Sequence, residues 1–155
     1  MRLLAPMLAF LMLVLPAGAV DFSSPRAVVE EAYRPYVSGE DFDWSKYDQS
    51  AVLSEGLKAL YAKDAEEAGD EIGRIDFDPL INGQDYDVKK LSIGEPQMQG
   101  DKAVVEVTFE NFERPETIHI SLVKEAGGYR IDNVTSLDPE YPYDLREILE
   151  SPLPQ

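Results

Sequence analysis

Apolar residues recur with a helical period in the segment that follows residue 20. Ser24-Pro25 has the character of a helix start, because serine accepts hydrogen bonds at the N-cap and proline suits the first helical position. Five apolar residues then repeat at helical spacing: Ala27, Val28, Ala32, Tyr33 and Tyr36. Pro35 is expected to kink this helix or to end it early.

A second helical pattern is predicted to begin near Ser50 and to stop at Ala68-Gly69, since glycine is a common helix end. Its predicted buried stripe is Leu53, Leu57, Leu60, Tyr61 and Ala65. Residues 37–48 between the two helices form a predicted loop. Its aromatic residues, which we interpret as anchors on the core, are Phe42, Trp44 and Tyr47.

From Tyr86 onward the period changes to two, which is typical of strands. The apolar positions change parity after Val88, which predicts a bulge near Lys89-Lys90. Strands are predicted over residues 103–109, 117–123 and 129–133, the last with Tyr129, Ile131 and Asn133 on one face. The predicted breaks are Gly100-Asp101, Arg114-Pro115 and Gly127-Gly128. A short helix over residues 143–149 ends the pattern.

Two helices followed by strands that are apolar on one face predict an α+β fold. We expect the N-terminal helices to pack on a curved antiparallel sheet, because nothing else in the chain can cover its apolar face. Residues 20–155 are expected to form a single domain, since no repeat or linker divides them.

Residues 1–19 have the anatomy of a cleavable signal peptide. A basic Arg2 precedes an apolar run from Leu3 to Leu15, and Ala17-Gly18-Ala19 has the Ala-x-Ala form of a cleavage site. The run is shorter than the roughly 20 apolar residues that a membrane span needs. We therefore predict a periplasmic or secreted protein with no membrane insertion after cleavage. It carries no lipid anchor of the cysteine-linked kind, because the sequence has no cysteine.

Net charge and composition exclude several classes of partner and several kinds of site. The net charge is −16, which argues against nucleic acid as a partner. The absence of cysteine removes disulfides, thiol nucleophiles and thiolate-bound zinc. No phosphate loop, dinucleotide fingerprint or zinc motif occurs, so the sequence predicts no cofactor and no metal.

Several segments together resemble a bacterial envelope family, domain of unknown function 3828. They are Ser24-Pro25 with Tyr33 and Tyr36, the Leu57/Leu60 helix, Ile75-Asp76-Phe77-Asp78-Pro79 with Gly83-Gln84-Asp85, and residues 127–134. The resemblance spans about residues 22–150 and implies a nuclear-transport-factor-2-like fold, in which helices and a bent sheet form a cone with a pocket at its wide end. It implies no activity.

The segment Ile75–Asp87 joins the predicted helices to the predicted sheet and concentrates polar side chains. Its candidate ligand-binding residues are Asp76, Asp78, Gln84 and Asp85, with Tyr33 and Tyr36 as possible pocket walls. The segment's oxygen-bearing side chains are of the type that calcium selects, but the EF-hand spacing fails. Capping of turns is the more usual role of such side chains, and we expect Phe77, Leu80 and Ile81 to act as core anchors, so the structural interpretation comes before the functional one.

Three functions stay open at this point. The main hypothesis is a non-catalytic protein that binds an unknown small ligand or another protein. One alternative is an enzyme that uses an Asp/Tyr acid–base pair in the cone; a core filled by aromatic and aliphatic side chains would weaken it. The other is an acidic inhibitor or immunity protein. No catalytic residue is assigned: the single histidine, His119, is expected on the outer face of the sheet.

Overall fold

The first helix, α1, spans Pro25–Ser38 in the computed structural model, which describes residues 20–39 and 51–153. The Ser24 side chain accepts a hydrogen bond from the Ala27 amide, as a helix N-cap should. The helix continues past Pro35 and ends at Gly39, whose φ of 71° suits glycine. Because proline has no amide proton, the bond that residue 35 would donate to the Glu31 carbonyl is missing, and the helix continues for only three residues beyond it.

The second helix, α2, spans Glu55–Ala68 and is capped by Ser54, so it begins later than the sequence pattern predicted. Leu53 lies before the helix and pairs with Ile131 in the sheet. The predicted stripe was wrong at Ala65, which is exposed, whereas Asp64 is buried. Part of the face of α2 that was predicted to be buried lies against α3 and a loop instead of the sheet. The apolar stripe of α2 is short for this reason.

Six antiparallel strands form one sheet, with β2 beside β3 and the others in the order β1-β3-β4-β5-β6. Their bounds are β1 Val88–Ile93, β2 Gln97–Gln99, β3 Lys102–Asn111, β4 Arg114–Glu125, β5 Gly128–Ser136 and β6 Tyr143–Asp144. The short strands β2 and β6 were not predicted. The last helix, α3, spans Leu145–Glu150 and is capped by Asp144.

The register of the sheet confirms one predicted irregularity and corrects two others. The bulge in β1 is present between Lys89 and Ser92. The β3–β4 turn is formed by Phe112-Glu113 rather than by Arg114-Pro115, which already belong to β4. A second bulge lies in β5, between Ile131, which pairs with Leu122, and Asn133, which pairs with Ser121. It changes the parity, so Asn133 leaves the face that Ile131 occupies.

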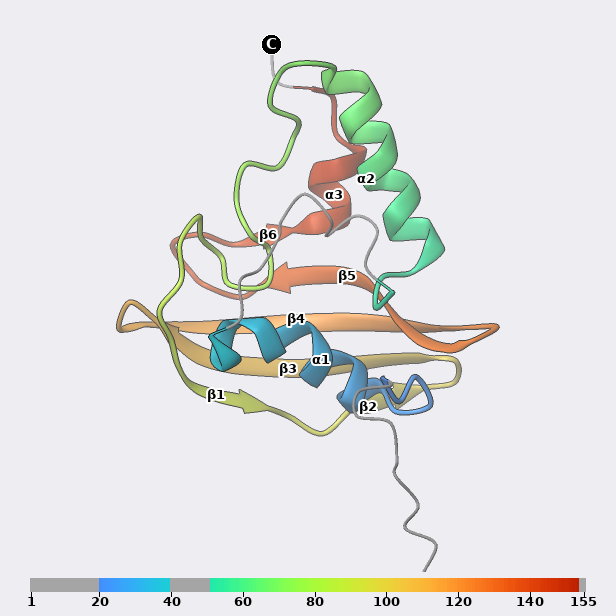
Figure 1. Ribbon diagram of the computed structural model, residues 1–155, viewed down its shortest axis with the longest axis vertical. Coiled ribbons are helices and arrows are strands. Elements are labelled where there is room, and N and C mark those ends of the chain that lie inside the picture. The colour runs from blue at the N-terminus through green and yellow to red at the C-terminus, as the bar shows by residue number, and fades with distance from the viewer. Residues whose placement is uncertain (1–19, 40–50, 154–155) are drawn as a thin grey trace, which may run out of the picture.

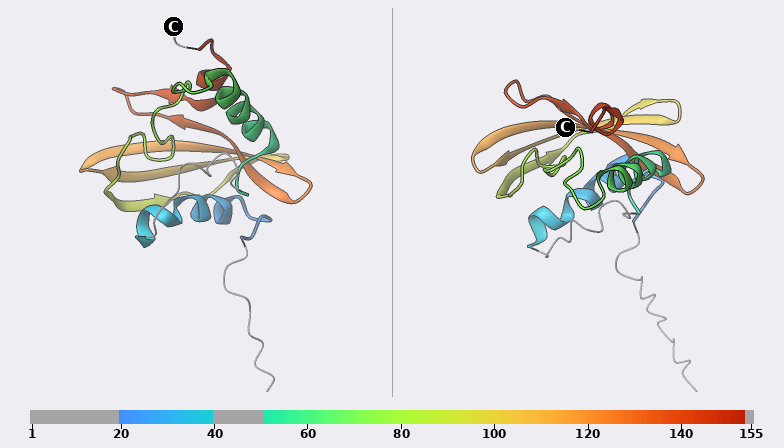
Figure 2. Two further views of the ribbon diagram at one scale, coloured as in Figure 1. Left: turned by 45° about the horizontal axis from the view of Figure 1, so that its top comes forward. Right: turned by 90° about the horizontal axis from the view of Figure 1, so that it is seen from above.

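The sheet bends over α1 and α2, which lie on the same side of it (Figure 1, Figure 2). The space between is filled by fully buried side chains from both layers: Tyr33, Leu57, Val107, Ile118, Ile120 and Ile131. The α+β fold with N-terminal helices on a curved antiparallel sheet is therefore confirmed. The predicted signal peptide at residues 1–19, Ser50 and the loop aromatics Phe42, Trp44 and Tyr47 lie outside the described residues.

Among the helices of the described residues, none has the length and apolar character needed to cross a membrane.

Candidate functional site

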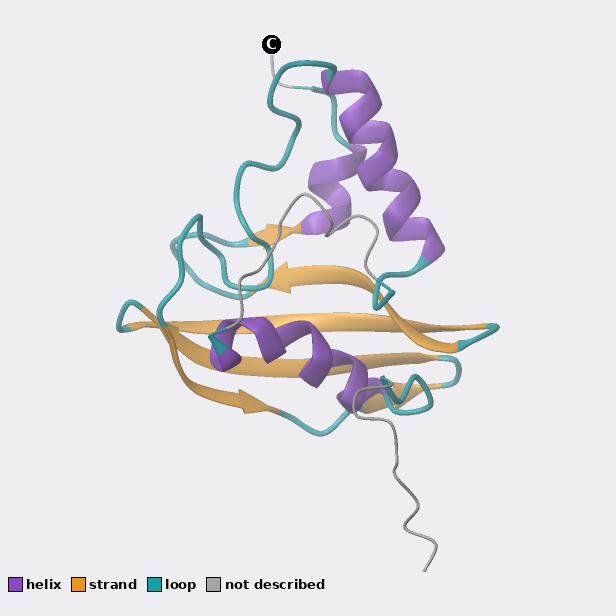
Figure 3. Cartoon of the chain, viewed as in Figure 1, coloured by secondary structure: helices purple, strands orange, loops and turns teal. Residues whose placement is uncertain are grey.

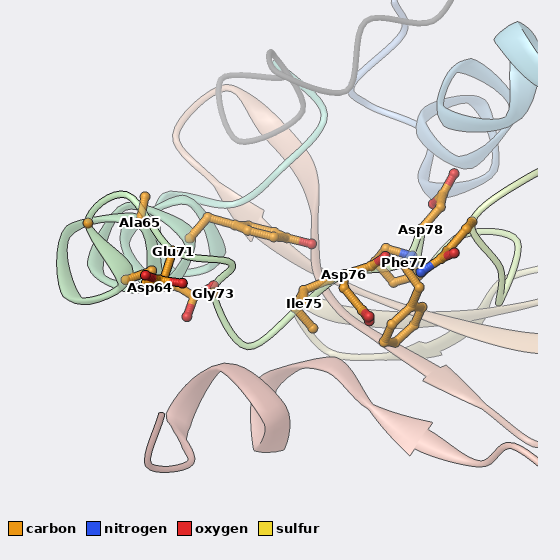
Figure 4. A pocket seen from close by; sticks show the side chains of 13 residues that line it. Asp64, Ala65, Glu71, Gly73, Ile75, Asp76, Phe77 and Asp78 are labelled. Atoms are coloured by element: carbon orange, nitrogen blue, oxygen red, sulfur yellow. Dashed lines mark hydrogen bonds between the residues drawn. The ribbon is translucent and has the colours of Figure 1, made fainter. Parts of the chain in front are cut away.

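The connection from α2 to β1 is a long loop that runs beside α2 before it reaches the sheet (Figure 3). Between this loop and α2 lies a pocket of about 590 Å³ (Figure 4). That volume is within the range of small-ligand sites in proteins. The pocket is lined by Tyr61, Asp64, Ala65, Ala68, Gly69, Glu71, Gly73, Ile75, Asp76, Phe77, Asp78, Pro79 and Gln84.

One wall of the pocket is fixed by a charged cluster. The Arg74 side chain bonds to the Asp64 carboxylate (2.8 Å), the Glu67 carboxylate (2.5 Å) and the Ser151 carbonyl (2.6 Å). Asp64 also accepts the Arg74 backbone amide. These bonds join α2, the loop and the end of α3, so Asp64 is a structural residue of this wall.

Opposite this wall, the floor of the pocket is aromatic and its edge carries exposed acidic side chains. The Phe77 ring packs edge-on against Tyr143, with ring centres 5.0 Å apart, and the Tyr143 hydroxyl donates to the Pro79 carbonyl. Glu71 and Asp76 are exposed at the pocket. An apolar floor with carboxylates at its edge fits the stem and charge of a lysine or arginine, or an amphipathic cation of similar shape.

Asp78 shapes the loop from inside the protein. It is 3 % exposed, and its carboxylate accepts hydrogen bonds from the Tyr36 hydroxyl (2.5 Å) and the Leu80 amide (2.8 Å). Burial raises the pKa of Asp78 to about 8, although both hydrogen bonds act in the opposite direction. In Figure 4 its carboxyl points away from the pocket, on the opposite side of the chain from Phe77.

The two tyrosines predicted as pocket walls are core residues. Tyr33 is fully buried and its hydroxyl donates to the Leu80 carbonyl at 2.7 Å. Tyr36 is 5 % exposed and makes the hydrogen bond to Asp78. Neither lines the pocket beside α2. An Asp/Tyr pair therefore exists, but it is closed inside the packed interior, where a substrate has no access.

The remaining predicted site residues lie at the surface. Gln84 is exposed, lines the pocket and donates from its amide to the Asp76 carbonyl at 3.2 Å. Asp85 is exposed outside the pocket, and its carbonyl accepts from Asn111. The structure thus brings Asp76 and Gln84 to one pocket, which Asp78 lines with its carboxyl turned away, and leaves Asp85, Tyr33 and Tyr36 elsewhere.

Sequence reasoning missed a polar network where the loop meets the sheet. The buried Asn82 side chain donates to Glu116 (3.2 Å), Ser136 (3.3 Å) and the Tyr141 carbonyl (3.3 Å). Arg114 pairs with Glu116 at 2.6 Å and donates to the Asn82 carbonyl. Burial raises the pKa of Glu116, and Asn82 and Arg114 oppose that shift. The signal in the sequence that could have identified this network is Glu116, an acidic residue at a strand position that faces the core.

Metal-ligating side chains do not converge in groups of three or more within residues 20–39 and 51–153. His119 lies half-exposed on the outer sheet face, 3.3 Å from Glu106.

No protein-family model matches the chain, and no curated protein sequence matches it. A solved structure does resemble it: a chain of the type VI native effector-immunity complex Tae3-Tai3 from Ralstonia pickettii. The match has a TM-score of 0.56 at 20 % sequence identity and covers 76 % of this chain and 98 % of that chain. At this identity the likeness establishes that the two chains share a fold.

Proposed function

We propose that this protein is a non-catalytic inhibitor of the immunity type, which binds a basic protein and blocks it. The observation that carries the proposal is the fold, which it shares with a chain of an effector-immunity complex. Membership of the envelope family, domain of unknown function 3828, is compatible with this role and stays a prediction.

Two features of this chain support binding over catalysis. The Asp78–Tyr36 pair is enclosed by the core, so this pair offers a substrate no access. The net charge of −16 would attract a basic protein over a distance and would speed the encounter. Glu71, Asp76 and Asp85 are exposed carboxylates that contribute to this attraction.

The test begins with capture of partners by the mature protein from an extract of its own cells at low salt. The retained protein is identified by mass spectrometry and purified, and its affinity for the mature chain is measured by calorimetry. We expect a basic protein that binds in a fixed ratio and weakens at least about tenfold between about 0.05 M and 0.5 M NaCl. It should also lose activity in the complex.

The matched variant removes three exposed charges together: Glu71→Gln, Asp76→Asn and Asp85→Asn. We expect slower association with the purified partner and a smaller salt dependence. The control is Asp101→Asn, which removes one acid at the β2–β3 turn, at the opposite end of the sheet. An acidic partner, or an affinity that salt leaves unchanged, would contradict the proposal.

The pocket beside α2 supports a second candidate function, binding of a small amphipathic cation. Its volume of about 590 Å³ and its apolar floor with Glu71 and Asp76 at the edge are the observations that favour it. Hexyltrimethylammonium is a suitable probe, and Phe77→Ala with Asp76→Asn is the matched variant. Saturable binding to the wild type and its loss in the variant is the expected result; equal binding to both would exclude the pocket.

We also propose that the protein acts outside the cytoplasm, after removal of residues 1–19. Intact-mass measurement of the exported protein is expected to give the mass of residues 20–155. An exported or cytoplasmic product that keeps Met1 would contradict this.

A further inference from the structure

Large apolar side chains are exposed together at one end of the sheet. We call the four residues Tyr86, Phe112, Leu137 and Tyr141 the aromatic end. They are 37 %, 58 %, 48 % and 52 % exposed, respectively. They come from three loops, which lie at the same end of the sheet in Figure 1: residues 82–87, the β3–β4 turn and the β5–β6 loop. Clusters of this kind mark interaction surfaces more often than single exposed residues do.

The three loops are joined at their base, so the aromatic end is held in a fixed arrangement. Asn82 links the first loop to Glu116 on β4 and to the Tyr141 carbonyl. The Arg114 guanidinium lies over the Tyr141 ring at 5.2 Å. The Phe112 amide donates to the Asp87 carbonyl. Aromatic groups that are ordered before binding lose little conformational entropy on contact, as hot-spot residues require.

The backbone at the tip of the β3–β4 turn supports the same interpretation. Phe112 and Glu113 both have positive φ, 49° and 69°, which a two-residue hairpin turn requires. Asparagine and glycine suit such positions, whereas a phenylalanine there is strained. The chain thus keeps a large exposed ring at a position where stability alone favours a small residue.

Charge around the aromatic end favours one kind of partner. Asp85, Glu113 and Glu140 are exposed acids on the same three loops. Cations of the described residues near this end are paired: Lys89 with Asp87, Lys90 with Glu110 and Arg114 with Glu116. A second copy of this chain would bring like charges together, since each copy carries −16.

We propose that the aromatic end is the face that binds the basic partner, with Phe112 and Tyr141 inserted into an apolar cleft whose edge carries lysine and arginine. Asp85, Glu113 and Glu140 surround the rings and pair with that edge. This assignment rests on the proposed function, because it names the surface through which an inhibitor of this kind acts.

The test places the photocrosslinking residue p-benzoylphenylalanine at position 112, 141 or 98 of the full chain in living cells. Met98 is the matched control, because it is 52 % exposed and lies on β2, at the other end of the sheet. We expect crosslinks from positions 112 and 141 to the same basic protein, and none from position 98. That protein is then purified and its affinity is measured.

Phe112→Ala and Tyr141→Ala are each expected to weaken binding of the purified protein at least about tenfold, with Met98→Ala unchanged. Thermal melting of each variant checks that it folds, and the crosslinking itself needs no alanine variant. Crosslinks from position 98 alone would overturn the assignment and leave the proposed function standing. Crosslinks between copies of this chain would overturn the assignment too. The absence of crosslinks at all three positions, together with no captured partner, would remove both proposals.

Discussion

Asp78 illustrates how one buried carboxyl organises a loop. Its side chain accepts a hydrogen bond from the Leu80 amide, and its backbone pairs with Gly83. These bonds close the turn that places Leu80 and Ile81 in the core. Asp76, two residues earlier, is exposed. The sequence analysis predicted both as ligand-binding residues, because an irregular loop has no period that shows which side chains face the core. Leu80 and Ile81 were correctly predicted as core anchors, since their size and apolarity identify them without the fold.

The pKa of Asp78 predicts a pH dependence of stability. It rises from 3.8 in the unfolded chain to about 8 in the folded protein, so the proton stabilises the fold. This contribution is complete below pH 3.8 and is lost as the pH rises toward 8. Relative to Asp78→Asn, the wild type should therefore lose up to about 1.4 kcal/mol of unfolding free energy per pH unit in this window.

Urea unfolding of the two proteins between pH 4 and pH 9 measures that difference. Asp76→Asn is the matched control at an exposed neighbour. Parallel pH profiles for wild type and Asp78→Asn would show that the buried carboxyl does not titrate as its surroundings imply.

At the scale of elements, period and turn chemistry predicted both long helices and the three long strands. The failures have separate physical causes. The start of α2 was misplaced because Ser50 and Ser54 are equally good caps by type, and the pairing of residues 52–54 with β5 decides between them. The strands β2 and β6 are too short to show a period. The bulge in β5 moved Asn133 outward, which only strand pairing reveals.

The β3–β4 turn offers a prediction in which stability and binding change in opposite directions. Phe112→Asn with Glu113→Gly supplies residues that tolerate positive φ, so unfolding free energy should rise by about 1–2 kcal/mol. The same change removes the proposed anchor and should weaken partner binding. Glu113→Gly alone is the control: it keeps Phe112, gains part of the stability and retains most of the binding. A double variant no more stable than wild type would show that the turn carries no strain.

The contact between α2, the loop and α3 depends on Arg74. Arg74→Met leaves the buried Asp64 carboxylate without its cation and frees the Ser151 carbonyl, so Tm should fall by more than about 5 °C. Adding Asp64→Leu should recover much of the loss, because the orphaned charge is then absent. Arg26→Met removes exposed ion pairs and should change Tm little. An equal effect of Arg26→Met and Arg74→Met would contradict this ranking.

For the whole molecule, the fold class followed from the order of elements. The pocket beside α2 could not be foreseen, because it depends on where the loop runs in space. The aromatic end was not predicted for a related reason: its four residues come from three segments that are far apart in the chain, and only the fold brings these segments to one end of the sheet.

The excess of negative charge predicts that salt acts oppositely on stability and on association. Self-repulsion among the carboxylates destabilises the compact state, so about 0.5 M NaCl should raise Tm by a few degrees. The same salt should weaken the complex with a basic partner. Thermal melting and calorimetry in one buffer series measure both effects, with NaCl as the only variable. A Tm that falls with NaCl would contradict the prediction.

The network around Asn82 has an evolutionary consequence. It fixes the bases of three loops through buried groups, whereas Phe112 and Tyr141 on these loops are more than half exposed. Substitutions at the tips can then accumulate without loss of the scaffold, as they do in the hypervariable loops of an antibody. Proteins with this framework can therefore change their partners while they keep the fold. The overall sequence similarity of two such proteins would then say little about which partner each one binds.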